Sequence, residues 1–226
     1  MKKVAVCIFA KLPRAGHVKT RLASSIGDEA AVTLAEAFLE DTITLATSFA
    51  DTSVIVAFDE PAPADRQKAD VRYELQGAGD LGARLELVLR RALETHAVAV
   101  ALGTDSPGIP RAFVAAALER LTGASEPTAL LGPTVDGGYW ILGTTRLDAG
   151  ALAGVRWSTS DTFADTERAL RRAGLDVVHG ERWFDVDEAA DLERLRASIA
   201  CGESLAPATA RALAKLSREE RRPTER

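Results

Sequence analysis

The sequence predicts an α/β fold in which helices cover both faces of a mainly parallel, mixed sheet. Short apolar runs alternate along the chain with longer segments whose apolar residues recur at helical spacing. The runs 4–10 and 97–102 are apolar at every position, as expected of strands that are covered on both faces. Strands that alternate with helices in this way build a parallel sheet between two helical layers.

The predicted elements follow one another with no internal repeat and no Gly/Ser linker. We expect strands at 4–10, 53–58, 71–75, 97–102, 128–132, 138–143 and 175–178. We expect helices at 28–49, 80–95, 110–122, 160–173, 188–200 and 207–216. The link between strands 128–132 and 138–143 is too short for a helical crossover, so this pair is expected to be antiparallel or out of plane.

Residue types at the helix ends support these assignments. Asp28 can cap helix 28–49, whose apolar residues fall near one face. Pro110 suits the first turn of helix 110–122, because its missing N–H needs no partner there. These end signals locate the helices independently of their apolar periodicity.

Length and composition indicate one globular domain. The 226 residues are 46% hydrophobic and 27% charged, and no apolar run approaches the roughly 18 residues of a membrane span. We expect a single domain at 1–205, followed by a C-terminal helix and polar tail at 206–226. Cys7 and Cys201 form no metal or disulfide pattern, so Cys7 is expected to be an inert, buried thiol in a cytoplasmic protein.

The charge is unevenly distributed. The net charge of −5 argues against a general nucleic-acid binder. Residues 1–21 nevertheless carry six basic side chains and no acidic one. A basic N-terminal segment on an acidic chain predicts an anionic ligand beside that segment.

The loop after the first strand carries most of these basic residues. Ligands of an open α/β sheet bind beyond the carboxyl ends of its strands, and Gly16 allows a phosphate to approach the backbone closely. The candidate phosphate ligands are Lys11, Pro13, Gly16, Lys19 and Arg21. Neither a dinucleotide fingerprint nor a Walker loop is present, and the alternative is a solvated basic loop.

Three aspartates are candidate metal ligands. Asp105 follows strand 97–102, and Asp185 and Asp187 lie two residues apart in an extended segment, so they point the same way. Carboxylates of this kind hold Mg²⁺ or Mn²⁺ together with substrate phosphate oxygens and water. The alternatives are a turn role for Asp105 and a capping role for Asp187 at helix 188–200.

Two further segments are candidates for the acceptor side of a site. Asp136, Gly137, Gly138 and Tyr139 form a tight turn beside an aromatic wall, although a plain hairpin turn is the alternative. The segment Trp157, Ser158 and Thr159 precedes a helix and can contact an acceptor, although a helix cap is the alternative.

The start of helix 80–95 is a candidate for binding a phosphate or a base. Backbone amides at a helix N-terminus bind anions, and the residues involved are Gly79, Asp80, Gly82 and Arg84. Asp80 can equally serve only as the N-cap of this helix.

These motifs together resemble a known family. FAKLPRAGHVKTRL (9–22), GDLGAR (79–84), GTDSP (103–107), GPTVDGGY (132–139), WST (157–159) and DVD (185–187) occur in this order. The chain is similar over about residues 4–195 to small bacterial nucleotide-diphospho-sugar-transferase-like proteins. These belong to the arsenosugar-biosynthesis and radical-SAM/selenodomain-associated glycosyltransferases. It is more distantly similar to molybdenum-cofactor and phospholactate guanylyltransferases.

The resemblance implies a three-layer α/β/α GT-A fold that binds a nucleotide diphosphate. It implies that Asp105 is a metal ligand, that the first loop lies over the phosphates, and that residues 136–139 face the transferred group or the acceptor. One departure is that sugar transferases of this fold usually carry D-x-D at the metal site, whereas Thr104 precedes Asp105 here.

Three functional hypotheses follow. The first is metal-dependent glycosyl transfer from a nucleotide sugar to a small acceptor, with Asp136 as the base and Lys19 and Arg21 neutralising the leaving group. The second is nucleotidyl transfer from an NTP to a phosphorylated small molecule, with release of pyrophosphate. The third is a non-catalytic nucleotide-binding module. We expect neither nucleic acid nor membrane as a partner. The sequence leaves open whether the protein forms a homodimer.

Overall fold

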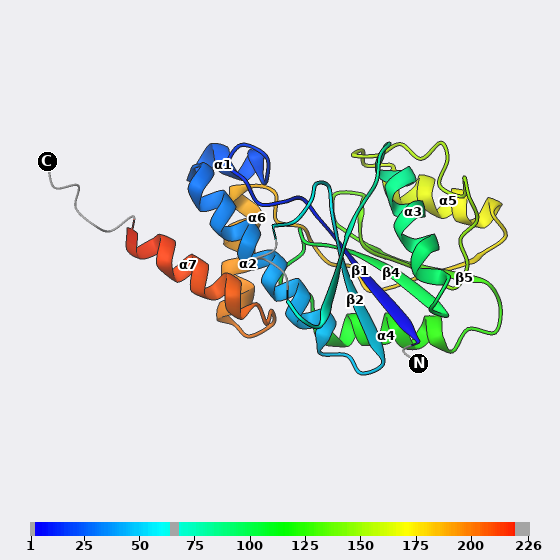
Figure 1. The fold of residues 1–226 in the computed structure, drawn as a ribbon. Helices are drawn as coiled ribbons and strands as arrows, with labels where there is room; N and C mark the ends of the chain where they lie inside the picture. Colours follow the sequence, from blue (N-terminus) through cyan, green and yellow to red (C-terminus); the bar gives the residue numbers. More distant parts are fainter. Residues whose placement is uncertain (1–2, 64–67, 220–226) are drawn as a thin grey trace, which may run out of the picture.

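The computed structural model describes residues 3–63 and 68–219, which form a sheet between two layers of helices (Figure 1). The strands are β1 (Val4–Ala10), β2 (Thr52–Phe58), β3 (Val71–Leu75), β4 (Val98–Gly103), β5 (Thr128–Pro133), β6 (Tyr139–Thr144) and β7 (Asp176–His179). The helices are α1 (Thr20–Ile26), α2 (Asp28–Thr47), α3 (Leu81–Leu93), α4 (Arg111–Thr122), α5 (Thr162–Arg172), α6 (Ala189–Ala200) and α7 (Pro207–Glu219).

The sheet has the order β3-β2-β1-β4-β6-β5-β7 and is mainly parallel. Strand β1 pairs in parallel with β2 and β4, while β6 runs antiparallel between β4 and β5. The carboxyl ends of β1 and β4 therefore lie side by side, and the start of β6 lies at the same edge. The predicted mixed sheet and the predicted antiparallel pair are both confirmed.

Each face of the sheet packs into its own apolar core. Val6 and Ile8 of β1 lie in the core beneath α2, α4, α6 and α7. Ala5 and Cys7 point to the opposite face and pack under α3 and α5. Because side chains of a strand alternate between the faces, only an unbroken apolar run can bury both, which explains the sequence of β1. Burial raises the pKa of the Cys7 thiol to about 12, as expected of an inert cysteine.

Two helix starts differ from the prediction. Gly27, with φ 84°, is the N-cap of α2, and Asp28 lies in the first turn, so Asp28 is not the cap. Glu188 is the N-cap of α6, and its backbone N–H donates to the carboxylate of Asp191 at 2.9 Å. Asp187 is therefore not the cap, because a capping box one residue further along already satisfies this end.

Helix α1 was not predicted, because its seven residues are too few to show a clear apolar period. Its own residues Leu22 and Ala23 are buried, and Gly27 separates it from α2. The predicted basic loop is therefore shorter than expected: residues 11–19 are loop, and Arg21 is in the first turn of α1.

Helix α7 packs beside α2, at the end of the molecule away from α3 and α5 (Figure 1). Asp41 of α2 is buried and accepts hydrogen bonds from the backbone N–H groups of Ala208 (2.9 Å) and Thr209 (2.8 Å). A side chain from another helix thus caps α7. Of the predicted polar tail, residues 220–226 lie outside the described residues, and the domain boundary at 205 stays a prediction.

No helix among residues 3–63 and 68–219 is long and apolar enough to cross a lipid bilayer.

Candidate functional site

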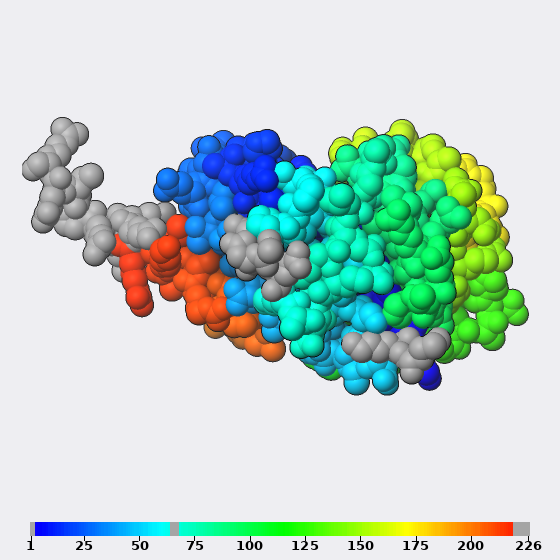
Figure 2. Space-filling model, viewed as in Figure 1, coloured from blue at the N-terminus to red at the C-terminus, as the bar shows by residue number. Residues whose placement is uncertain are grey.

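A cleft of about 890 Å³ opens at the edge of the sheet where β1 and β4 end. Its lining comes from α1 and α2 on one side and from α3 and the segment 157–162 on the other. The space-filling view shows these sides as two bulges with a depression between them (Figure 2). The predicted site residues that line the cleft are Lys11, Lys19, Arg21, Arg84, Asp105, Asp136, Gly138, Tyr139, Trp157, Ser158, Thr159, Asp185 and Asp187.

The most enclosed charged group of the cleft is the ammonium of Lys19. Its Nζ lies 2.5 Å from Oδ1 of Asp105 and 3.2 Å from Oδ1 of Asp187, and it donates to the carbonyl of Val186 at 2.7 Å. Burial alone would lower the pKa of Lys19, but the charges and hydrogen bonds of the two carboxylates outweigh it and raise this pKa above its ordinary value. Lys19 is therefore protonated and joins the tip of β4 to the segment 185–187.

Asp185 lies on the same edge without a cation in direct contact among the described residues. Ser106 donates a hydrogen bond to Oδ1 of Asp185. Burial raises the pKa of Asp185 to about 7; the Ser106 hydrogen bond opposes this shift, and the negative charges of Asp105 and Asp136 add to it. The positive charge of Lys19 opposes the shift as well, and the raised pKa shows that two neighbouring carboxylates act on Asp185, where a further cation would be favoured.

A divalent cation fits this edge in part. Among residues 3–63 and 68–219, no group of three or more His, Cys, Asp or Glu side chains is arranged to hold a metal on its own. Mg²⁺, however, usually takes only one or two carboxylates and completes its coordination with phosphate oxygens and water. Asp105 and Asp185 would supply two such carboxylates, although Oδ1 of Asp105, like that of Asp187, already faces the ammonium of Lys19. The metal site at Asp105, Asp185 and Asp187 stays a prediction.

The remaining basic residues of the first loop are distributed around the cleft. Lys11 is exposed and lines the cleft, and no described residue forms a hydrogen bond or ion pair with its ammonium. Arg14 pairs with Glu60 at 2.8 Å and is not part of the lining. Pro13 and Gly16 are also outside the lining, so phosphate contact by these two residues stays a prediction.

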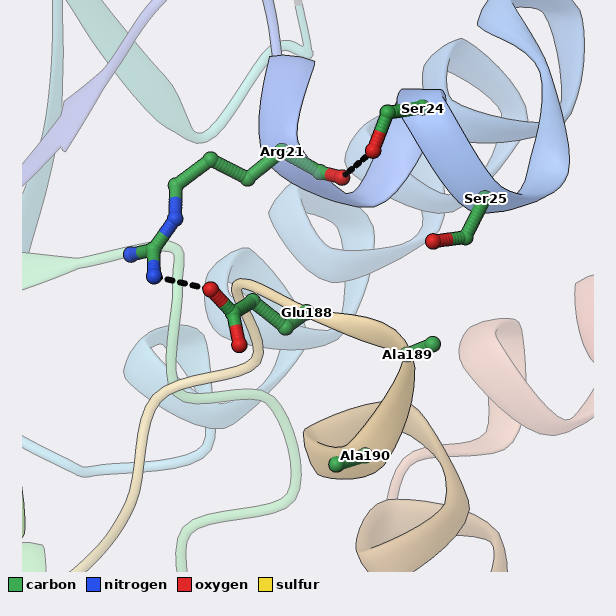
Figure 3. Close-up of a pocket in the computed structure, with 6 residues that line it drawn as sticks. All are labelled: Arg21, Ser24, Ser25, Glu188, Ala189 and Ala190. Atoms are coloured by element: carbon green, nitrogen blue, oxygen red, sulfur yellow. Dashed lines mark hydrogen bonds and ion pairs between the residues drawn. The ribbon is translucent and has the colours of Figure 1, made fainter.

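Arg21 reaches from α1 toward the start of α6, where it pairs with Glu188 (Figure 3). Both side chains are mostly exposed, and Arg21 also lines the main cleft. A smaller pocket of about 340 Å³ lies beside this pair and is lined additionally by Ser24 and Ser25. Arg21 therefore stands at the boundary between the two cavities.

The turn between β5 and β6 is built by Asp136. Its Oδ1 accepts hydrogen bonds from Oγ1 of Thr134 (2.5 Å) and from the backbone N–H of Gly138 (3.1 Å). Gly137 has φ 93°, and a Cβ there would lie 2.2 Å from the carbonyl oxygen of Ser160. The predicted tight turn is present, and it leaves Oδ2 of Asp136 without a described donor beside the cleft.

Two aromatic side chains line the part of the cleft that the sequence predicts to face an acceptor. The hydroxyl of Tyr139 is buried next to Thr166, and burial raises its pKa against the opposing effect of that neighbour. Tyr139 therefore offers the cleft its ring rather than its hydroxyl. Trp157 packs against Gly82, where a Cβ would lie 2.9 Å from the indole ring. Gly82 thus permits the close contact between α3 and this wall.

Ser158 and Thr159 continue the lining next to Trp157. Ser158 has φ 57°, a left-handed conformation that non-glycine residues rarely adopt. Oγ1 of Thr159 donates to the carbonyl of Arg156 at 3.1 Å. Both residues shape the turn before α5, and their contact with an acceptor stays a prediction.

The start of α3 shows the capping role of Asp80 and leaves the binding role a prediction. Oδ1 of Asp80 accepts from the backbone N–H of Ala83 at 2.9 Å, so Asp80 is the N-cap. Nε of Arg84 donates to the carbonyl of Gly79 at 2.9 Å, and Arg84 lines the cleft. Gly79 and Asp80 are not part of the lining, so their contact with phosphate stays a prediction.

Gln76 and Ser106 are polar residues of the cleft that sequence reasoning missed. Gln76 is buried, and its Nε2 donates to the carbonyls of Ala10 (3.1 Å) and Ala57 (2.9 Å), which ties together the ends of β1 and β2. Ser106 holds Asp185, as described above. The only signal for Gln76 was its position directly after the strand 71–75. The signal for Ser106 was its position next to Asp105, which the sequence had already singled out.

Several solved structures share this fold. A candidate nucleotide-diphospho-sugar transferase from Desulfovibrio desulfuricans G20 is 28% identical, with 97% of this chain and 98% of that chain covered and a TM-score of 0.82. A cytidylyltransferase from Leptospira borgpetersenii is 14% identical, with 97% and 96% covered and a TM-score of 0.60. These similarities confirm the predicted nucleotide-diphospho-sugar transferase fold.

A third structure is glucosyl-3-phosphoglycerate synthase from Mycobacterium tuberculosis, in complex with Mn²⁺, uridine diphosphate and phosphoglyceric acid. It is 13% identical, with 85% of this chain and 74% of that chain covered and a TM-score of 0.52. No curated protein matches the sequence. A family model matches residues 42–159, which is more than half of the chain, so the protein belongs to the bacterial family described as "Uncharacterized protein conserved in bacteria (DUF2064)".

Proposed function

We propose that the protein is a metal-dependent transferase that moves a glycosyl group from a nucleotide-activated sugar to a small-molecule acceptor. The observation that carries this proposal is the placement of basic and acidic groups in one cleft. Lys11 and Arg21 line it together with Asp105, Asp136 and Asp185. A nucleotide diphosphate needs the cations, and a divalent metal needs the carboxylates.

The 28% identity to a candidate nucleotide-diphospho-sugar transferase over nearly the whole chain supports this reading. The ring of Trp157, held against α3 at Gly82, also supports it, because a sugar packs well on an aromatic face. The narrower resemblance to the arsenosugar-biosynthesis and radical-SAM/selenodomain-associated group stays a prediction.

In the proposed reaction, a hydroxyl of the acceptor attacks the anomeric carbon of the sugar. The bond between that carbon and the diphosphate oxygen breaks, and the nucleoside diphosphate leaves with the electron pair. Lys11 and Arg21 stabilise the charge that develops on the leaving group. Asp136 takes the acceptor proton on Oδ2, because its Oδ1 already accepts from Thr134 and Gly138.

Asp105 and Asp185 would hold Mg²⁺ or Mn²⁺, which would supply further neutralisation of the diphosphate. The ammonium of Lys19 offsets only part of the negative charge at this edge, so without a further cation these two carboxylates would repel a phosphate. This repulsion is also the argument against a non-catalytic nucleotide-binding module.

A second candidate is nucleotidyl transfer. A phosphorylated substrate would attack the α-phosphate of an NTP, and pyrophosphate would leave. The observation that favours it is the sequence around Asp105, where Thr104 stands in place of the first aspartate of D-x-D. Asp185, from a separate segment, then supplies the second carboxylate.

One experiment separates the candidates. The purified protein is melted with Mg²⁺ or Mn²⁺ and a panel of nucleotide sugars and NTPs, and products are then analysed with small acceptors. We expect nucleotide sugars to raise Tm, since a ligand at 100 times its Kd stabilises by about 2.7 kcal/mol. Stabilisation by NTPs alone, with pyrophosphate released on adding a sugar phosphate, would favour the second candidate. Absence of any metal-dependent nucleotide effect would contradict both.

A further inference from the structure

We propose that Lys19 is a positioning residue that holds Asp105 and Asp187 together and that it does not bind phosphate. Phosphate binding then rests on Lys11 and Arg21. This inference rests on the proposed function and deepens it, because it assigns different ligands to two cations of the same basic loop.

The ammonium of Lys19 has no donor left for a phosphate. An ammonium carries three N–H groups, and Lys19 faces three acceptors: Oδ1 of Asp105 (2.5 Å), the carbonyl of Val186 (2.7 Å) and Oδ1 of Asp187 (3.2 Å). The ring of Phe38 lies on a further side, with its centroid 5.6 Å from Nζ. Only 6% of the side chain is exposed. A phosphate could reach Lys19 only by displacing these partners.

The contacts of Lys19 join segments that are far apart in the sequence. The backbone N–H of Val186 donates to the carbonyl of Asp105 at 2.7 Å, and the carbonyl of Val186 accepts from Lys19. Lys19 itself adopts a left-handed conformation with φ 47°, immediately before α1. Such a conformation persists only where the surroundings support it, and the buried side-chain contacts of Lys19 are part of those surroundings.

Lys19 and a metal ion would therefore compete for the same oxygens. The ammonium offsets one of the two negative charges of Asp105 and Asp187, and its removal leaves both carboxylates without a counter-ion among the described residues. A divalent cation would gain from that loss, because it would no longer have to displace a fixed positive charge. The removal of Lys19 would not strengthen the binding of a phosphate, because a phosphate is itself negative.

Lys11 and Arg21 are placed differently. Lys11 is exposed at the cleft, and no described residue is bonded to its ammonium. Arg21 is 68% exposed, and its partner Glu188 is 53% exposed. An ion pair between exposed groups contributes little, so a phosphate can replace Glu188 at small cost.

The test compares Lys19→Met with Lys11→Met in the full chain, using two probes measured by calorimetry. The first probe is inorganic tripolyphosphate without divalent metal, and the second is Mn²⁺ without nucleotide. We expect Lys11→Met to weaken tripolyphosphate binding about tenfold and to leave Mn²⁺ binding unchanged. We expect Lys19→Met to weaken tripolyphosphate binding less than Lys11→Met does, because only the charge of the two freed carboxylates then opposes it, and to tighten Mn²⁺ binding about tenfold.

The proposal is overturned if Lys19→Met weakens tripolyphosphate binding as Lys11→Met does, or if it fails to tighten Mn²⁺ binding. A lysine with a merely structural role would weaken both probes on removal, which also overturns it. If the wild-type protein binds no tripolyphosphate, the phosphate site of the proposed function fails, and the Mn²⁺ measurement still decides the role of Lys19.

A second measurement needs no folded variant of Lys19. The ¹⁵N resonances of the lysine ammonium groups are followed in the wild-type protein while each probe is added. Tripolyphosphate should shift the signal of Lys11 and leave that of Lys19 in place, whereas Mn²⁺ should broaden that of Lys19. A shift of the Lys19 signal with tripolyphosphate would overturn the proposal.

Discussion

Gly82 and Trp157 are packed so closely that a Cβ at residue 82 would lie 2.9 Å from the indole ring. The contact joins α3 to the segment before α5, and the ring lines the cleft. The width of the cleft therefore depends on the absence of a side chain at one helical position.

Gly82→Ala should displace the Trp157 ring and alter the cleft. Overpacking of this kind costs about 1–3 kcal/mol, because the ring cannot move without disturbing its neighbours. The free energy of unfolding in urea and the affinity for a nucleotide sugar should both fall. Ala83→Ser, at the next and exposed position, serves as a control and should change the stability by no more than about 0.5 kcal/mol. Equal stability in the two variants would show that Trp157 is not constrained by Gly82.

Asp136→Asn tests the role of Asp136 as a base independently of its role in the turn. An asparagine can still accept from Thr134 and Gly138 through its carbonyl oxygen, so the turn should survive. It cannot take a proton, and the loss of a general base typically slows a reaction about 10²–10⁴-fold. We expect transfer to slow by that factor while nucleotide affinity stays unchanged. A variant that keeps its full rate would remove Asp136 from the mechanism.

Asp41→Ala should loosen α7. Asp41 is buried and accepts from two backbone N–H groups at the start of this helix, at Ala208 and Thr209, which would be left without their capping partner. We expect a loss of about 2 kcal/mol in the free energy of unfolding. The adjacent Glu40 makes only an exposed pair with Arg211, so Glu40→Ala should cost less than about 1 kcal/mol. Similar losses in both variants would contradict the capping role.

The stability of the protein should fall in acid through Asp165. The hydrogen bonds and charge of Arg156 hold the pKa of Asp165 at about 2, against a burial effect that opposes the shift. Because the folded-state pKa lies below the unfolded one, this contribution is complete above about pH 4 and is lost as the pH falls toward 2. Urea unfolding between pH 5 and pH 3 should show a smaller decrease for Asp165→Asn than for the wild type. Identical decreases would exclude Asp165 as a source.

The fold could be predicted from the sequence because its signals are local. The apolar run of β1 and the short link before β6 predict a mainly parallel sheet with one reversed strand, and the structure has both. Helix α1 could not be predicted, because seven residues carry too little periodicity. The capping alternative for Asp187 is wrong, since sequence spacing does not reveal that Glu188 and Asp191 already form the capping box.

The site was predictable in position but not in its pairings. The sequence rule that ligands bind beyond the strand ends brings Lys11, Lys19 and Asp105 to one edge, where the cleft lies. The rule does not say which cation meets which acid. Lys19 faces Asp187 from 168 positions away in the chain, and only the packed tertiary structure decides such a contact. Gln76 could not be predicted as a site residue either, because its partners are carbonyl groups of β1 and β2 that only the folded structure brings next to it.

The variant Asp105→Ala tests most directly whether Asp105 helps to bind a metal–nucleotide complex. The melting temperature of wild type and variant is measured with Mn²⁺, with and without a panel of nucleotide sugars. We expect metal and nucleotide together to raise the melting temperature of the wild type more than the two do separately. The variant should still unfold cooperatively and should lose that gain. Full metal-dependent stabilisation of Asp105→Ala would show that Asp105 does not help to bind this complex.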